Sequence, residues 1–242
     1  MNILRSEWLK LVSVRSTWLI LLFMVVLEGL VASLAVTLPD IKDLRDKQIF
    51  DLVIGSHLST VLMFSLGALL STNEYRHGTA NSTFVVTPRR ERVIAAKLAV
   101  GLAIGIAGAL LYIAVNAGLG LSLLSNRGVK VDADAAVNAY LGVGAGLVLC
   151  CVFGVALGTV LRNQILAVVA GLVVILLAGT FALIIGTSVG QYFPGESLLG
   201  LQGSPEGKGI VLSQTTGGLV FASYCLVLAA AGIVLSRTRE IT

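Results

Sequence analysis

Six long stretches of this sequence hold almost no charged residue, and they constrain the fold more than any other feature. They cover residues 17–38, 52–72, 98–124, 137–161, 165–186 and 217–235, and each is 19 to 27 residues long. A helix crosses the hydrocarbon core of a bilayer with about 20 apolar residues. Only 12% of the residues are charged, whereas about 25% is usual in a soluble domain. The sequence therefore predicts an all-α, polytopic membrane protein with six transmembrane helices, in a single domain over residues 1–242.

Lysine and arginine are distributed unevenly between the segments that join these spans. The termini and the second and fourth loops hold eleven basic and four acidic residues, whereas the other loops hold six basic and eight acidic ones. Cytoplasmic loops of membrane proteins are enriched in Lys and Arg. Both termini are therefore expected in the cytoplasm. The net charge of +4 follows from this asymmetry, so nucleic acid is not an expected partner.

Two shorter segments are also predicted to be helical. Before the first span, apolar residues recur at helical spacing between Arg5, Glu7 and Lys10, which is typical of a helix lying in the membrane interface. A flexible basic tail is the alternative. In the connection between the fifth and sixth spans, an apolar patch follows Pro194, and we expect a short re-entrant or surface helix over residues 196–201.

The sequence carries no motif for catalysis or nucleotide binding. Within the predicted spans the only acidic or histidine side chains are Glu28 and His57, and no H-E-x-x-H motif is present. Residues 203–209 resemble a phosphate loop but have three residues instead of four between the first two glycines. The chain is therefore not expected to be an enzyme, and uphill transport would take its energy from a partner or an ion gradient. The three cysteines lie in apolar stretches and are expected to be packing residues.

The second loop, residues 73–97, reads NEYRHGTANSTFVVTPRRERVIAAK and is the most informative segment. Gly78 can end the preceding helix, residues 80–86 can form a short interfacial helix, and Thr87 before Pro88 is typical of a helix N-terminus. Arg89, Arg90 and Arg92 then stand at the start of the third span. An ordinary basic loop that only fixes topology is the alternative.

This loop resembles the cytoplasmic signature of ABC type-2 permeases, the membrane subunits of ATP-binding-cassette exporters. The resemblance rests on the order of Glu74, Arg76, Gly78, Thr79, Pro88, Arg90 and Lys97 before a glycine-rich span. Residues 6–11 and 15–18 also resemble small bacterial members, and the similarity in span number and loop lengths extends over the whole chain.

The resemblance implies a permease that forms the cargo pathway of an ATP-driven exporter in a bacterial plasma membrane. It implies pairing with a second permease chain, identical or different, and with two separate ATPase subunits. ATP and magnesium would be held by those subunits, and no cofactor is expected in this chain. The loop would be the coupling segment that docks on the ATPase. Its expected residues are Glu74, Arg76, Gly78, Thr79, Phe84, Val85, Pro88, Arg89 and Arg90.

Polar residues inside the spans suggest a second candidate site. Glu28 is the one formal charge in mid-span, and such a residue is costly in hydrocarbon unless it faces protein or water. His57 and Asn116 fall at a similar depth, so the three are predicted to form a polar layer in the outer half of the membrane. The layer is either part of the cargo path or the dimer seam, or a hydrogen-bonded structural contact.

Two other functions remain open at the level of sequence. A scaffold or immunity protein would bind a partner in the bilayer without transport, and it would not co-purify with an ATPase. A gradient-driven carrier would transport without ATP hydrolysis. The glycine pairs 101/105, 142/146, 154/158 and 186/190 allow helices to approach closely, either within the chain or between two permease chains.

Overall fold

The computed structural model describes residues 3–38, 56–78, 90–177, 184, 186–203 and 212–238, and every regular element in these ranges is helical. The elements are α1 (Ile3–Ser13), α2 (Arg15–Thr37), α4 (Ser56–Arg76), α6 (Arg90–Asn116), η1 (Ala117–Leu121), α7 (Ser122–Asn126), α8 (Ala133–Leu161), α9 (Gln164–Leu176), α11 (Thr187–Gly190), α12 (Pro194–Gln202) and α13 (Gln214–Thr238). Of these, η1 is a π-helical segment that joins α6 to α7. The predicted all-α class is confirmed.

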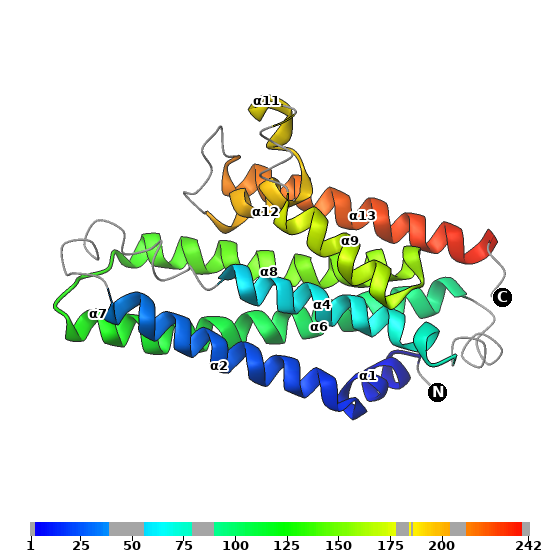
Figure 1. Cartoon of the computed structure of the whole chain (residues 1–242), viewed down its shortest axis with the longest axis horizontal. Helices are drawn as coiled ribbons and strands as arrows, with labels where there is room; N and C mark the ends of the chain where they lie inside the picture. Colours follow the sequence, from blue (N-terminus) through cyan, green and yellow to red (C-terminus); the bar gives the residue numbers. More distant parts are fainter. Residues whose placement is uncertain are drawn as a thin grey trace.

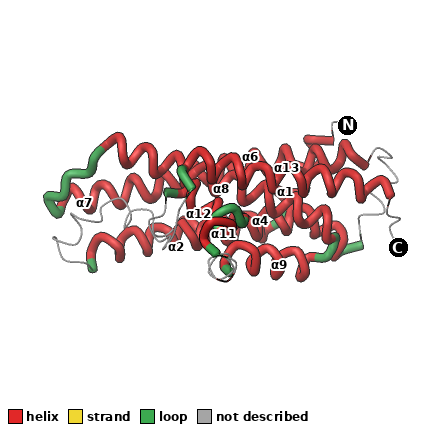
Figure 2. Tube along the Cα trace, turned by 90° about the horizontal axis from the view of Figure 1, so that it is seen from above, coloured by secondary structure: helices red, strands yellow, loops and turns green. Residues whose placement is uncertain are grey.

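The long helices run side by side along the longest axis of the molecule, with α8 at the centre (Figures 1 and 2). Helix α8 packs against α4, α6, α12 and α13, and α9 lies against α4 and α8. The end of α4, the starts of α6 and α9, helix α1 and the end of α13 lie at one end of the bundle (Figure 1). We call this the basic end, because its described residues include Arg5, Lys10, Arg15, Arg76, Arg90, Arg92, Lys97 and Arg162.

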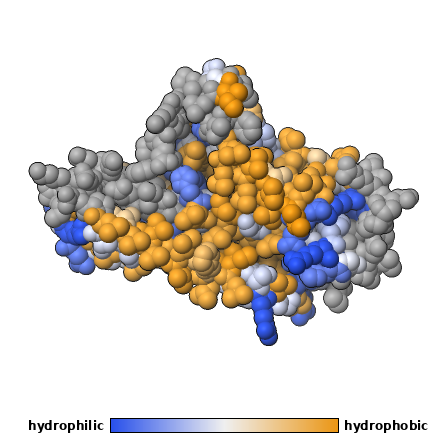
Figure 3. Space-filling view, in the orientation of Figure 1, coloured by the Kyte–Doolittle hydropathy of each residue, from blue (hydrophilic) through white to orange (hydrophobic). Residues whose placement is uncertain are grey.

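Four helical stretches are long and apolar enough to cross a membrane: Arg15–Thr37, Arg90–Asn126, Ala133–Leu161 and Gln214–Ser236. Helix α4 covers most of the predicted second span, whose first four residues lie outside the described ranges. Helix α9 has only 13 residues and ends at Leu176, and most of the remainder of the predicted fifth span is likewise outside those ranges. Figure 3 shows a broad apolar surface over the middle of the bundle. Six spans therefore stay a prediction, whereas four are supported by the helices themselves.

Glycine permits the close contact between α4 and α8. A Cβ atom at Gly67 would lie 2.0 Å from the Cys151 carbonyl oxygen, and one at Gly154 would lie 2.2 Å from the Phe64 carbonyl oxygen. Neither backbone can move aside, so only glycine fits at these positions. Within the chain, Gly154 faces α4, just as the pair 101/105 faces α8, so these small residues serve packing inside one molecule.

The helix predicted over residues 196–201 is present as α12 (Pro194–Gln202). Pro194 occupies its first turn, and Gly203 closes it in the left-handed conformation with φ of 71°. Its side chains Leu198 and Leu201 are buried. Because α12 packs between α8, α9 and α13, it belongs to the helical core of the molecule.

Candidate functional site

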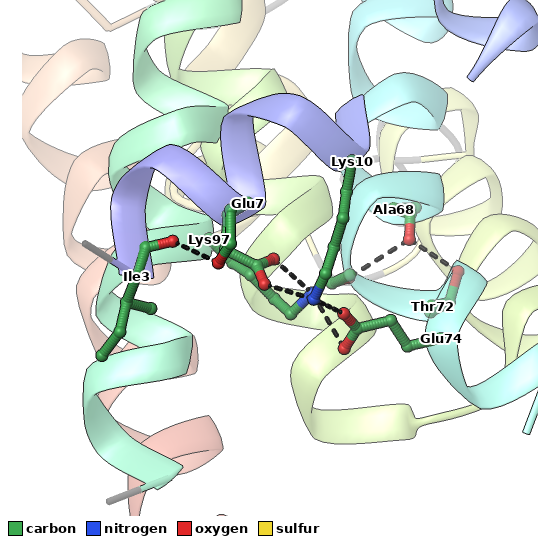
Figure 4. A network of polar contacts seen from close by, with 9 residues as sticks. Ile3, Glu7, Lys10, Ala68, Thr72, Glu74 and Lys97 are labelled. Atoms are coloured by element: carbon green, nitrogen blue, oxygen red, sulfur yellow. Dashed lines mark hydrogen bonds and ion pairs between the residues drawn. The ribbon is translucent and has the colours of Figure 1, made fainter. Parts of the chain in front are cut away.

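Four charged side chains from three helices meet at the basic end (Figure 4). Lys10 Nζ lies 2.7 Å from Glu7 Oε1 and 2.5 Å from Glu74 Oε1. Lys97 Nζ lies 2.8 Å from Glu7 Oε2 and 3.1 Å from Glu74 Oε2. Each carboxylate therefore contacts both ammonium groups, and the four formal charges cancel. We call Glu7, Lys10, Glu74 and Lys97 the ionic cluster.

The helices place these groups in different surroundings. Glu7 and Lys97 are almost completely buried, with 1% and 4% of their surface exposed, whereas the Lys10 side chain is 43% exposed. Helix α1 turns Glu7 and Leu11 inward and exposes Leu4, Trp8 and Leu9. The exposed surface of α1 also includes Arg5 and Lys10, so it combines apolar and basic side chains. It suits a helix whose outer face touches lipid, as predicted for the N-terminal segment.

The pairing alters the acid–base properties of the more accessible members. Burial raises the pKa of Glu74, but the charges of Lys97 and Lys10 and their hydrogen bonds outweigh it, so the pKa lies below its usual value. For Lys10 the effects have the opposite sign. Burial alone would lower the pKa of Lys10, but hydrogen bonds to Glu7 and Glu74 outweigh this effect, so the pKa lies above its usual value. Glu74 and Lys10 therefore hold their charges at neutral pH. The four ion pairs of the cluster join α1, α4 and α6.

The ionic cluster contains one residue predicted for coupling, Glu74, and three whose role was not predicted. Arg76 is exposed, and its Nη1 donates to Gln164 Oε1 at 3.3 Å. Gly78 has φ of 68° in the turn that follows α4, as expected for a helix end. Arg90 Nη1 donates to the Ser236 carbonyl oxygen at 3.1 Å and so caps the last turn of α13. The predicted coupling residues Thr79, Phe84, Val85, Pro88 and Arg89 lie outside the described residues.

A second polar centre surrounds Glu28, which is 1% exposed and lies in α2. Asn116 Nδ2 donates to Glu28 Oε1 at 2.6 Å, and Ser59 Oγ donates to Glu28 Oε2 at 3.2 Å. Tyr140 OH donates to Asn116 Oδ1 at 2.9 Å. We call Glu28, Ser59, Asn116 and Tyr140 the polar layer. His57 takes part in none of these bonds.

The polar layer and the ionic cluster are far apart along the helices that they share. On α4, Ser59 and Glu74 are separated by about 22 Å, at 1.5 Å per residue. On α6, Asn116 and Lys97 are separated by about 29 Å by the same measure. The π-helical segment η1 begins directly after Asn116. Such segments are frequent at functional sites.

The unpredicted members of the ionic cluster carried weak signals in the sequence. Glu7 and Lys10 are three residues apart, which places them on one helix face. Lys97 directly precedes an apolar run, so the sequence alone places it at the end of the predicted loop. Among the described residues, no group of three or more His, Cys, Asp or Glu side chains is arranged to hold a metal ion.

The sequence was also compared with known proteins. The sequence model of the ABC-2 family transporter protein matches residues 3–189. This range includes both polar centres and all of the described helices up to α9. Neither the search of curated proteins nor the search of solved structures gives a match.

Proposed function

Since the chain belongs to the ABC-2 family of transporter membrane proteins and is a permease subunit of an ABC transporter, we propose that it forms the cargo pathway of an ATP-driven exporter. The proposal includes six spans with both termini in the cytoplasm of a bacterial cell. The charges support this orientation, because most described basic residues lie at the basic end.

Permeases of this family work with ABC ATPase subunits in the membrane. We propose two such subunits, which bind ATP and magnesium, and a second permease chain, identical or different. This chain would supply no catalytic residue and would bind no cofactor of its own. The free energy of transport would therefore reach it mechanically, through the segment that touches the ATPase.

The ionic cluster is the observation that carries this proposal. Residues 77–89 connect α4 to α6, and Glu74 in the last turn of α4 pairs across this connection with Lys97 near the start of α6, with 3.1 Å between Nζ and Oε2. Both also contact α1 through Glu7 and Lys10. A force on the segment would thus move α1, α4 and α6 together. An ordinary loop that only sets topology needs no such connection.

The cargo path is proposed to include Glu28, His57 and Asn116. Glu28 and Asn116 are buried among α2, α4, α6 and α8 in this conformation, so the path would be closed at the polar layer. His57 is partly exposed and lies in the first turn of α4. Opening would require the helices around Glu28 to separate, which the coupling segment could drive from the basic end.

The test of coupling uses the segment that we expect to dock on the ATPase. Phe84→Asp should uncouple ATP hydrolysis from transport or release the ATPase, because docking depends on apolar packing. Arg89→Ala should have little effect, since an exposed ion pair contributes only about 0 to 1 kcal/mol. The measurements are pull-down of the ATPase and cargo-stimulated ATP hydrolysis at matched expression. Full assembly and transport in Phe84→Asp would remove the segment from this role.

The orientation is tested by cysteine labelling in intact cells. Cysteines placed at Asp43, Asp132 and Ser204 should react with a reagent that cannot cross the membrane, and one at Thr83 should not. The three native cysteines are buried, so the background is low. Labelling at Thr83 from outside would contradict the orientation.

A further inference from the structure

A groove at the basic end lies outside both polar centres. It has a volume of about 580 Å³ and lies between the end of α4 and the start of α9. Tyr75, Arg76 and Arg162 line its polar side, and Ile165, Val168 and Val169 line its apolar side. Tyr75 and Arg76 come from the end of α4, and Arg162 links α8 to α9.

The two arginines give the groove a positive charge that no acidic side chain of the described residues compensates. Arg76 donates to the Gln164 side chain, and Arg162 Nη2 donates to the Leu235 carbonyl oxygen at 3.0 Å. Both acceptors are neutral. Among the described residues, no acidic side chain lines the groove or forms an ion pair with either arginine. Glu74, next to Tyr75 in the sequence, is instead bound to Lys10 and Lys97.

An apolar stripe leads away from the groove along α9. Ile165, Val169, Val173 and Leu176 are 77%, 52%, 41% and 60% exposed and recur every three or four residues, so they share one helix face. The stripe is about 17 Å long at 1.5 Å per residue. One leaflet of a bilayer contributes about 15 Å to the hydrocarbon core. The stripe therefore has the length of one leaflet and starts at the charged groove.

We propose that the groove binds the headgroup of an anionic phospholipid of the cytoplasmic leaflet, whose acyl chains lie along α9. Arginine matches phosphate oxygens in geometry and charge, and basic pockets between transmembrane helices on the cytoplasmic side bind anionic headgroups. A soluble protein docked at the basic end would cover the arginines but not a stripe that extends through one leaflet. The leaflet named here rests on the proposed orientation.

The test compares photo-cross-linking at two exposed positions in the full-length chain. A p-benzoylphenylalanine at Ile165 probes the groove, and one at Leu226, which is 71% exposed on α13, probes bulk lipid. The chain is reconstituted in vesicles with equal amounts of phosphatidylglycerol and phosphatidylcholine that carry the same acyl chains. Mass spectrometry then gives the ratio of the two lipid adducts. We expect phosphatidylglycerol to be enriched at Ile165 by about fivefold for each arginine in contact, and no enrichment at Leu226.

The control variants separate the groove from general surface charge. Arg76→Gln should lower the enrichment at Ile165 by about fivefold, whereas Arg15→Gln, an exposed arginine of the same end outside the groove, should leave it unchanged. Equal adducts at Ile165 and Leu226, or equal effects of the two variants, would overturn the proposal. So would adducts of Ile165 with another protein chain in place of lipid. Because the assay needs neither ATP nor transport, these outcomes leave the exporter proposal to its own tests.

Discussion

The ionic cluster and the polar layer both bury carboxylates, but they do so by different means. In the cluster, two carboxylates meet two ammonium groups, and all four ion pairs are 2.5 to 3.1 Å long. In the polar layer, Glu28 meets the neutral side chains of Asn116 and Ser59, and no cation of the described chain pairs with it. The cluster lies at the basic end, where the Lys10 side chain is 43% exposed, whereas Glu28 lies well inside α2.

Because of this difference, we expect the ionic cluster to hold its helices together and the polar layer to separate more easily. A neutral set of ion pairs between three helices tolerates burial and holds those helices in one arrangement. A carboxyl group held only by neutral donors is a weaker link, because each such bond across membrane helices contributes about 0.6 kcal/mol on average. The basic end is therefore the part that should move as a unit, and the polar layer is the part that should open.

Removal of Lys97 should cause the largest loss of stability. Lys97→Met leaves Glu7 buried beside Glu74 with only Lys10 to neutralise both, and breaking a buried ion pair from one side costs about 3–5 kcal/mol. Lys10→Met should cost much less, because the Lys10 side chain is 43% exposed and water can replace it. The measurement is thermal unfolding in detergent, followed by the fluorescence of Trp8 on α1 in a Trp18→Phe background. Equal losses for the two variants would show that the burial of Lys97 is unimportant.

Changes at Glu28 should have a smaller and more selective effect. Glu28→Leu leaves the donors of Asn116 and Ser59 buried without an acceptor, at a cost of about 1–3 kcal/mol. Glu28→Gln keeps one acceptor oxygen and should be closer to the native protein in stability. If the polar layer is part of the cargo path, both variants should also reduce transport at normal expression. Unchanged transport in both would leave the layer as a structural contact only.

Much of the fold, but little of the two centres, follows from the sequence. The apolar runs predict the long helices, because length and composition alone decide whether a segment suits the bilayer. Pro194 and Gly203 bracket α12, because each has a local backbone preference. Pairings such as Lys97 with Glu7, which are 90 residues apart, depend on how each helix is rotated about its axis. No local pattern encodes that rotation.

The polar layer illustrates the same limit at the scale of two residues. Depth along the helix predicts that Glu28, His57 and Asn116 are near one level, and the structure does join Glu28 to Asn116. Residues two apart on a helix point in nearly opposite directions, so Ser59 faces Glu28 and His57 does not take part. Tyr140 was missed for a related reason, because a tyrosine near the end of an apolar run is ordinarily read as an interface anchor.

The pH dependence of stability should distinguish the centres further. The pKa of Glu74 lies below its usual 4.5, so its contribution is complete above that pH and is lost as the pH falls through the folded-state value. The pKa of Lys10 lies above its usual 10.5, so its contribution is complete below that pH and is lost as the pH rises through the folded-state value. Between these limits Glu74 and Lys10 should contribute a constant amount. Melting curves followed by Trp8 fluorescence at a series of pH values test this prediction. In Glu74→Gln, the melting temperature should fall less steeply as the pH is lowered.

The smallest expected effect concerns the outermost bond of the polar layer. Tyr140→Phe removes the hydroxyl that donates to Asn116 Oδ1 at 2.9 Å and leaves the ring and the contact between Asn116 and Glu28 in place. The expected loss is about 0.6 kcal/mol, the average for a hydrogen bond between membrane helices. In the double variant with Glu28→Gln, the two losses should not be additive, because Asn116 bonds to both side chains and can reorient when either partner changes. Strict additivity in a double-mutant cycle would show that Tyr140 and Glu28 act independently, and the four residues would then not form a single layer.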